Sequence, residues 1–145
     1  MISFDTNILF PACDSSSPLH PKACEYLGQL GRSENVCVCE QVLMELYCLL
    51  RNPTVCANPL PAMEAVHVIH RFRSNPRWRL VDVLQSPALM EHVWSLASKQ
   101  GFAYRRIFDI RLAETLRQHG VREFATRNTK DFRDAGFARV WNPLA

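Results

Sequence analysis

Residues 1–10, MISFDTNILF, place a charged side chain directly after a short apolar strand. Ile2 and Phe4 alternate with polar residues at the two-residue period of a strand, so we expect a strand at 2–5 that ends on Asp5. A carboxylate at the end of a buried strand is costly to keep charged unless a hydrogen bond, a cation or a metal ion compensates it. The rest of the chain must supply whatever compensates Asp5.

The composition is that of an ordinary folded domain. The 145 residues are 48% hydrophobic and 21% charged, and a chain of this length can bury a substantial core. We therefore expect one domain over residues 1–145. The N-terminus lacks the features of an export signal and no apolar stretch approaches the length of a membrane span, so we expect a cytoplasmic protein with no membrane partner.

Cysteine and charge usage narrow the possible ligands. In the absence of export we expect the six cysteines to be reduced thiols. Cys37 and Cys39 have one residue between them, which is not the spacing of a zinc knuckle, so core packing is the favoured interpretation. The net charge is only +3, yet just three of the seventeen cations are lysines. Arginine favours bidentate contacts to phosphate, which is a weak indication of a nucleic-acid ligand.

Short apolar segments alternate with amphipathic ones along the chain. We expect strands at 2–5, 36–39, 78–84, within 122–128 and within 138–143, and helices at 21–30, from 40 until Asn52 and Pro53 stop it, 61–72, 87–99 and 106–120. This alternation predicts an α/β fold with a central, mostly parallel sheet of four to five strands. Such sheets bind ligands beyond the carboxyl ends of their strands, which is where Asp5 lies.

Glu45 is a second carboxylate in an unexpected place. It shares one helical stripe with Val42, Leu46 and Leu49 in a segment that is apolar nearly all round, so we expect Glu45 to be buried with its helix. A core glutamate that is hydrogen-bonded to the backbone or paired with an arginine is the alternative.

Asp109 repeats this pattern in the helix predicted at 106–120. It lies on the same face as Leu112, Ala113 and Leu116, where an apolar residue would be typical. The alternative is that Asp109 caps the helix N-terminus, because Asp is a favoured capping residue.

Asp131 follows the fourth predicted strand. We expect it to lie in a polar loop with Thr126 and Asn128, although Asx turns account for many such residues. Two of the four carboxylates thus follow strands and two lie on helix faces, which indicates that they converge on one site.

Four carboxylates in one site imply a metal ion. Close carboxylates repel one another and raise each other's pKa values unless a divalent cation neutralises them. A donor set of oxygen atoms selects Mg²⁺, or Mn²⁺, over zinc. Such an ion orients a water molecule, lowers its pKa and promotes in-line attack on a phosphodiester. The residues therefore predict metal-dependent phosphodiester hydrolysis.

Four stretches in this order also resemble a known family. FDTNILF at 4–10, MELYCLLRNP at 44–53, FDIRLAETLRQHG at 108–120 and ATRNTKDF at 125–132 are similar to motifs of the PIN-domain ribonucleases, and within them the VapC-type toxins of bacterial toxin–antitoxin pairs. The resemblance implies a PIN-like three-layer α/β/α sandwich that cuts RNA as an endoribonuclease. It also implies a cognate antitoxin protein as inhibitor and, as is common in the family, a homodimer.

The resemblance assigns roles by position. The catalytic acids would be Asp5, Glu45, Asp109 and Asp131, with Asp5 and Asp109 as direct metal ligands and Asp131 acting through water. The residues that position them would be Thr6, Asn7, Thr126 and Asn128.

Arginines near these positions are candidates for contacts with RNA. Arg105, Arg106 and Arg127 are adjacent in sequence to proposed site residues. The segment at 70–79, HRFRSNPRWR, also combines arginines with Phe72 and Trp78, a mixture typical of single-stranded RNA binding. Its alternative is a solvated helix end followed by a tryptophan that faces the core.

Two other functions remain open at this point. A PIN-like module could bind RNA or a protein partner without turnover, using its carboxylates structurally. A phosphatase could use Asp5 as nucleophile. Enzymes of that kind, however, share a second aspartate two residues later, and this chain has Asn7 at that position.

Overall fold

The computed structural model describes residues 1–145, in which strands and helices alternate. The strands are β1 (Ile2–Phe4), β2 (Cys37–Cys39), β3 (Arg79–Val81), β4 (Glu123–Ala125) and β5 (Arg139–Trp141). The helices are α1 (Thr6–Cys13), α2 (His20–Leu30), α3 (Glu40–Arg51), α4 (Ala62–Arg73), α5 (Pro87–Ala97), α6 (Arg106–Gln118) and α7 (Thr129–Phe132). None of these helices is long and apolar enough to cross a membrane.

All the strand pairs are parallel, and the order in which the chain adds strands to the sheet reverses at β1. β1 pairs with β4 and β4 with β5, while β2 pairs with β3. A parallel bridge from Ile2 to Val36 joins the two groups, so the order is β3-β2-β1-β4-β5. The chain therefore runs outward from β1 to β3, then crosses to β4 on the other side. In α/β sheets the carboxyl ends beside such a change form the ligand-binding crevice.

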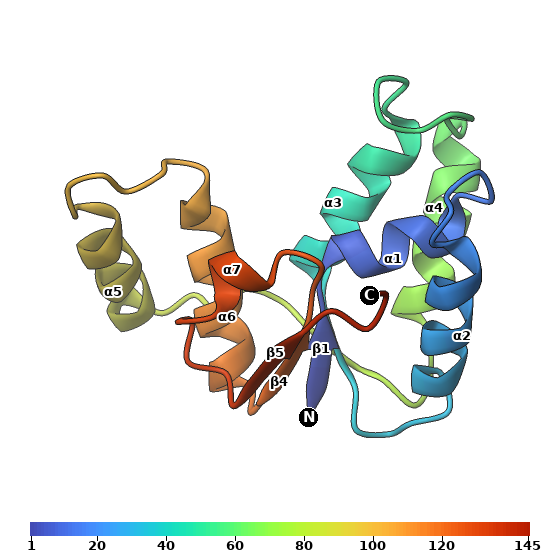
Figure 1. Cartoon of the computed structure of the whole chain (residues 1–145). Helices are drawn as coiled ribbons and strands as arrows, with labels where there is room; N and C mark the ends of the chain where they lie inside the picture. Colours follow the sequence, from blue (N-terminus) through green and yellow to red (C-terminus); the bar gives the residue numbers. More distant parts are fainter.

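Helices cover both faces of this sheet, as predicted for a three-layer α/β/α sandwich. Figure 1 shows α1, α2, α3 and α4 on one side of the strands and α5 and α6 on the other. α1 packs against α2 and α3, and α5 packs against α6. The α/β fold expected from the alternation is confirmed.

The core is built around the central strands of the sheet. Phe4, Phe124 and all three residues of β2 are fully or almost fully buried. Strands covered by helices on both faces are expected to be apolar on both. All six cysteines are free thiols, and Cys37 and Cys39 lie in the core, as the packing interpretation requires.

Two helices were not expected from the sequence. α1 begins directly after Asp5, and its eight apolar-rich residues include Pro11, so it shows no clear helical periodicity. Ile8 and Leu9 are fully buried, which indicates that tertiary packing stabilises this helix. The second is α7, which replaces the polar loop predicted around residue 131. The strand predicted at 78–84 is shorter in the structure, where β3 ends at Val81.

Candidate active site

Asp5 lies where β1 ends and α1 begins, at the point where the strand order reverses, which we call the switch point. Its backbone is extended and its side chain caps α1, because Oδ1 accepts a hydrogen bond from the Thr6 amide at 2.7 Å. Oδ2 accepts hydrogen bonds from Asn7 Nδ2 and from the Thr126 hydroxyl, each at 2.7 Å. The carboxylate is therefore held by residues at the ends of two neighbouring strands, β1 and β4.

The directions of these bonds follow from the Arg127 amide. A backbone N–H can only donate, so the Asn7 atom 3.0 Å from it must be Oδ1, which turns Nδ2 toward Asp5. Thr126 Oγ1 accepts from Asn7 Nδ2 at 3.1 Å and from the Asn128 amide at 3.0 Å. The single hydroxyl proton of Thr126 is then left for Asp5. The predicted positioning residues Asn7 and Thr126 do contact Asp5, as does Thr6.

Glu45 approaches the same point from α3. The Thr6 hydroxyl lies 3.0 Å from Glu45 Oε2, and Gln41 Nε2 donates to Oε1 at 3.3 Å. The prediction that Glu45 is buried was wrong, because it lies on an exposed side of α3 next to Met44, which is 68% exposed. An apolar helix predicts burial only where other elements cover it, and this side of α3 is left open.

Asp109 faces the other carboxylates from the first turn of α6. It does not cap the helix, since the N-cap is Arg105, which makes no side-chain capping bond. The pKa of Asp109 is raised to about 6, mainly by burial and further by repulsion from Asp5, Glu45 and Asp131. Burial also raises the pKa of Asp5, with a further contribution from Glu45 and an opposing one from the Thr126 hydrogen bond. The structure thus brings these carboxylates close enough to repel one another.

Asp131 lies at the edge of this group, on α7. Its carboxylate accepts a hydrogen bond from Asn128 Nδ2, and its backbone carbonyl accepts one from Arg106 Nη2 at 3.1 Å. It influences the pKa of Asp109 but has no hydrogen bond to Asp5 or its partners. Asn128 therefore orients Asp131 through its side chain, whereas its amide N–H contacts Thr126.

Gln41 links the two helices that carry Glu45 and Asp109, a role that the sequence analysis missed. Besides Glu45, its Nε2 lies 3.3 Å from the Phe108 carbonyl, and its Oε1 accepts from Arg111 Nη2 at 3.0 Å. Gln41 is buried. The available signal was its position one helical turn before Glu45 on the same face.

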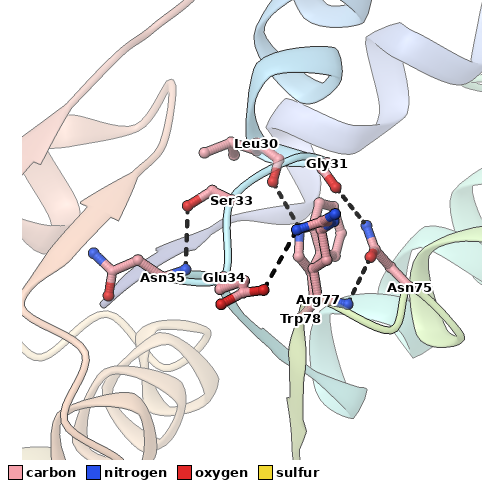
Figure 2. Close-up of polar contacts among 8 residues, drawn as sticks. All are labelled: Leu30, Gly31, Ser33, Glu34, Asn35, Asn75, Arg77 and Trp78. Carbon is pink, nitrogen blue, oxygen red and sulfur yellow. Dashed lines mark hydrogen bonds and ion pairs between the residues drawn. The ribbon is translucent and has the colours of Figure 1, made fainter.

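The candidate RNA-contacting arginines differ in their surroundings. Arg105, Arg106 and Arg127 are all exposed near the carboxylates. By contrast, the segment at 70–79 lies at the amino ends of β2 and β3. Figure 2 shows Trp78 donating its indole N–H to the Leu30 carbonyl, at 2.9 Å.

Two of the four arginines in the same segment form ion pairs, whereas Arg71 and Arg79 are exposed without a carboxylate partner. Arg73 pairs with Glu40 at 2.7 Å and Arg77 with Glu34 at 3.4 Å. Phe72 stacks on Trp78, with 6.4 Å between the ring centroids. The structure therefore favours the alternative for residues 70–79, a helix end followed by a tryptophan that faces the core.

A cavity of about 470 Å³ opens beside Asp109, between α5, α6 and α7. It is lined by Asp109, Asp131 and the cationic side chains of Lys99, Arg106 and Arg117, among others. Asp5 and Glu45 do not line it. Asp109 thus stands between this cavity and the side of α6 that faces α3.

The donor set fits a hard divalent cation, although the side chains do not form a complete coordination shell. No three His, Cys, Asp or Glu side chains are arranged to hold one metal ion. Mg²⁺ commonly keeps several water ligands and binds proteins through one or two carboxylates. Asp109 receives no hydrogen bond from the protein, so its partly buried carboxylate is available to a cation.

Comparison with known proteins identifies close relatives. The PIN domain family matches residues 2–138. Two curated proteins, both named Ribonuclease VapC24 and from Mycobacterium tuberculosis strains CDC 1551 / Oshkosh and ATCC 25618 / H37Rv, are 51% identical over 144 residues, which cover 99% of this chain and 97% of each relative.

Solved structures share the fold at lower identity. The crystal structure of Mycobacterium tuberculosis VapC20, described as a Sarcin-Ricin loop cleaving toxin, has a TM-score of 0.67 and 20% identity, with coverage of 94% of this chain and 96% of that one. A toxin-antitoxin complex from Klebsiella pneumoniae has a TM-score of 0.58 and 21% identity, covering 99% and 98%.

Proposed function

The chain belongs to the PIN-domain family, and from this premise we propose that it is the endoribonuclease toxin of a toxin–antitoxin pair, which hydrolyses RNA phosphodiester bonds with a divalent metal ion. The identity of 51% over nearly the whole length to a ribonuclease supports the activity. The single observation that carries the mechanism is the meeting of Asp5, Glu45 and Asp109 at the switch point, with raised pKa values at Asp5 and Asp109. We further propose that residues 1–145 act as one PIN-like domain.

The residues suit Mg²⁺ or Mn²⁺, with Asp5 and Asp109 as the direct ligands. When bound, the ion would supply an activated water and neutralise charge that develops on the phosphate. Glu45 and Asp131 would act through water molecules. Oxygen donors without histidine or cysteine support these metals over zinc.

The chain's own contribution is to hold the ligands in place. Thr6, Asn7 and Thr126 donate hydrogen bonds to Asp5, so that its carboxylate is fixed before substrate arrives. Gln41 fixes Glu45 relative to α6. Such supporting contacts orient the ligands, and their loss typically costs roughly 10- to 100-fold in metal affinity or activity.

RNA would approach through the exposed arginines around the carboxylates. Arg105 and Arg106 lie at the start of α6 and Arg127 follows β4, so all three flank the acidic residues. Guanidinium groups bind phosphate oxygens in a bidentate manner. We propose that they hold the phosphates on either side of the scissile bond.

The proposal extends to partners and location. A cognate antitoxin would silence the enzyme, and two copies would associate as a homodimer, as the resemblance to the VapC-type toxins implies. The solved relative described as a toxin-antitoxin complex supports the first of these. Its place of action would be the cytoplasm, where cellular RNA is found.

The test is RNA cleavage by the purified chain in EDTA, Mg²⁺ or Mn²⁺. We expect cleavage only with metal, and a loss of at least about 100-fold in Asp5→Asn and Asp109→Asn. Glu34→Gln, which changes an exposed carboxylate at the opposite end of the sheet, is the matched control and should cleave like the wild type.

Two results would contradict the proposal. Cleavage that is unchanged in both aspartate variants would remove the metal mechanism. Tight RNA binding without cleavage under any metal condition would instead support a PIN-like binding module. Circular dichroism of each variant separates a loss of activity from a loss of fold.

A further inference from the structure

Two exposed aromatic side chains lie at the start of α6, the helix that carries Asp109. Tyr104 is 78% exposed and Phe108 is 56% exposed. Phe108 lies in the first turn of α6, directly before Asp109, and Tyr104 lies in the turn that leads into this helix. We refer to Tyr104 and Phe108 as the aromatic pair.

Each ring of the aromatic pair carries a guanidinium group. Arg105 lies 5.7 Å from the Tyr104 ring centroid, and Arg111 lies 5.9 Å from that of Phe108. This places flat apolar surfaces and positive charge together. Unpaired nucleotides have the matching chemistry, because a base offers a π-face and its phosphate a negative charge.

The position of Phe108 is fixed relative to the carboxylates. Gln41 Nε2 lies within hydrogen-bonding distance of both the Phe108 carbonyl and Glu45. Arg111, which covers the Phe108 ring, donates to the Oε1 atom of the same glutamine. The stacking surface and the acidic site are therefore held by one side chain.

We propose that the aromatic pair is a stacking subsite for an unpaired base of the RNA next to the scissile phosphate. This inference rests on the proposed ribonuclease function. In an A-form duplex the bases are stacked on one another and paired, so a side chain cannot take their place beside them. A base that stacks on Phe108 must first be free of its duplex neighbours.

The test measures binding without cleavage. Single-stranded RNA oligonucleotides with 2-aminopurine at successive positions are titrated with protein in EDTA, and fluorescence quenching reports stacking. We expect quenching at one or two neighbouring positions, and affinity reduced about tenfold in Phe108→Leu. Phe108→Trp should retain both signals, since it keeps a flat ring.

Trp94 provides the matched control. It lies on α5, is 57% exposed and does not line the cavity beside Asp109. Trp94→Leu therefore removes an equally exposed aromatic ring away from the site and should leave affinity and quenching unchanged. A duplex of the same sequence should bind about tenfold more weakly than the single strand and resist cleavage in Mg²⁺.

Three outcomes would overturn the inference. Phe108→Leu and Tyr104→Ala could bind single-stranded RNA like the wild type, or single strand and duplex could bind equally. Phe108→Leu could instead weaken association with a second copy or with an antitoxin while RNA binding is retained, which would assign the aromatic pair to a protein interface. If the wild-type chain binds and quenches the oligonucleotides but never cuts them, the proposed function fails and the stacking subsite stands.

Discussion

The two ends of the parallel sheet carry polar groups arranged in opposite ways. At the amino ends of β2 and β3, the amino-end cluster joins Leu30, Gly31, Glu34, Asn75, Arg77 and Trp78. In it, donors meet acceptors and a cation meets an anion (Figure 2). At the carboxyl end, the acidic cluster of Asp5, Glu45, Asp109 and Asp131 brings like charges together.

This difference between the two clusters indicates that the amino-end cluster serves stability and the acidic cluster serves function. A satisfied cluster next to aromatic packing stabilises the fold, since it leaves no buried polar group without a partner. A group of mutually repelling carboxylates costs stability and persists where catalysis or binding requires it. Substitutions at the amino end should therefore change stability alone, and substitutions at the carboxyl end should change activity more than stability.

The largest expected effect is on stability at the amino end. Trp78→Ala removes an indole that packs on Phe4 and Phe72 and donates to Leu30. We expect the free energy of unfolding to fall by about 3 kcal/mol, with unchanged cleavage per folded molecule. Urea unfolding and RNA cleavage at matched folded concentration measure the two. A loss of specific activity without a loss of stability would contradict the comparison.

Removing a hydroxyl group at the carboxyl end of the sheet should instead lower activity more than stability. Thr126→Val removes the donor to Asp5, so we expect RNA cleavage to fall roughly 10- to 100-fold. Thr115→Val is the matched control, because Thr115 is equally buried but its hydroxyl has no hydrogen-bond partner. The control should keep full cleavage and at least wild-type stability. Equal activity in the two valine variants would show that Thr126 does not position Asp5.

The repulsion within the acidic cluster predicts a pH dependence of smaller size. With the pKa of Asp109 raised from its ordinary value of 3.8 to about 6, the folded state binds more protons than the unfolded chain between these values. Stability contributed by the protonated carboxyl is therefore present below pH 4 and lost as the pH rises to about 6.

Asp109→Asn should remove this loss. In EDTA, the variant should match the wild type near pH 4 and exceed it at pH 7 by about 1 kcal/mol, a figure that allows for solvent screening of this half-exposed group. Denaturant unfolding at each pH measures the difference. If the free energy of unfolding of the two proteins changes with pH in the same way across pH 4–7, the pKa of Asp109 is not raised in the folded state.

The smallest effect is expected for the exposed ion pair of the amino-end cluster. Arg77→Gln breaks the contact to Glu34, and both side chains are more than half exposed. Exposed pairs contribute little, so stability should change by less than about 0.5 kcal/mol and RNA cleavage should not change. A clear fall in RNA affinity would indicate that residues 70–79 contact RNA after all.

Much of the fold could be predicted because its signals are local. Strands such as Cys37–Cys39 are apolar throughout, and helices such as α6 show clear periodicity and end before Gly120, whose φ is +86°. α1 could not be predicted in this way, because Pro11 and the surrounding apolar residues hide its periodicity. Burial of Ile8 and Leu9 by distant segments stabilises it.

The candidate site was predictable in part for the same reason. A carboxylate after a strand or on an apolar helix face is visible in the sequence, which singled out Asp5 and Asp109. The exposure of Glu45 and the contact of Gln41 with the Phe108 carbonyl are not visible, since they depend on how α3 lies relative to other helices.

The sequence by itself determined which charged groups exist and where each stands in its own strand or helix. Only the tertiary structure decided that Asp5, Glu45 and Asp109 meet, because β1 lies between β2, which leads into α3 with Glu45, and β4, which follows α6 with Asp109. It also decided what compensates Asp5: the hydroxyl of Thr126, the amide of Asn7 and the backbone of Thr6. Solvation and Coulomb repulsion depend on distances between segments far apart in the chain, and no local pattern encodes those distances.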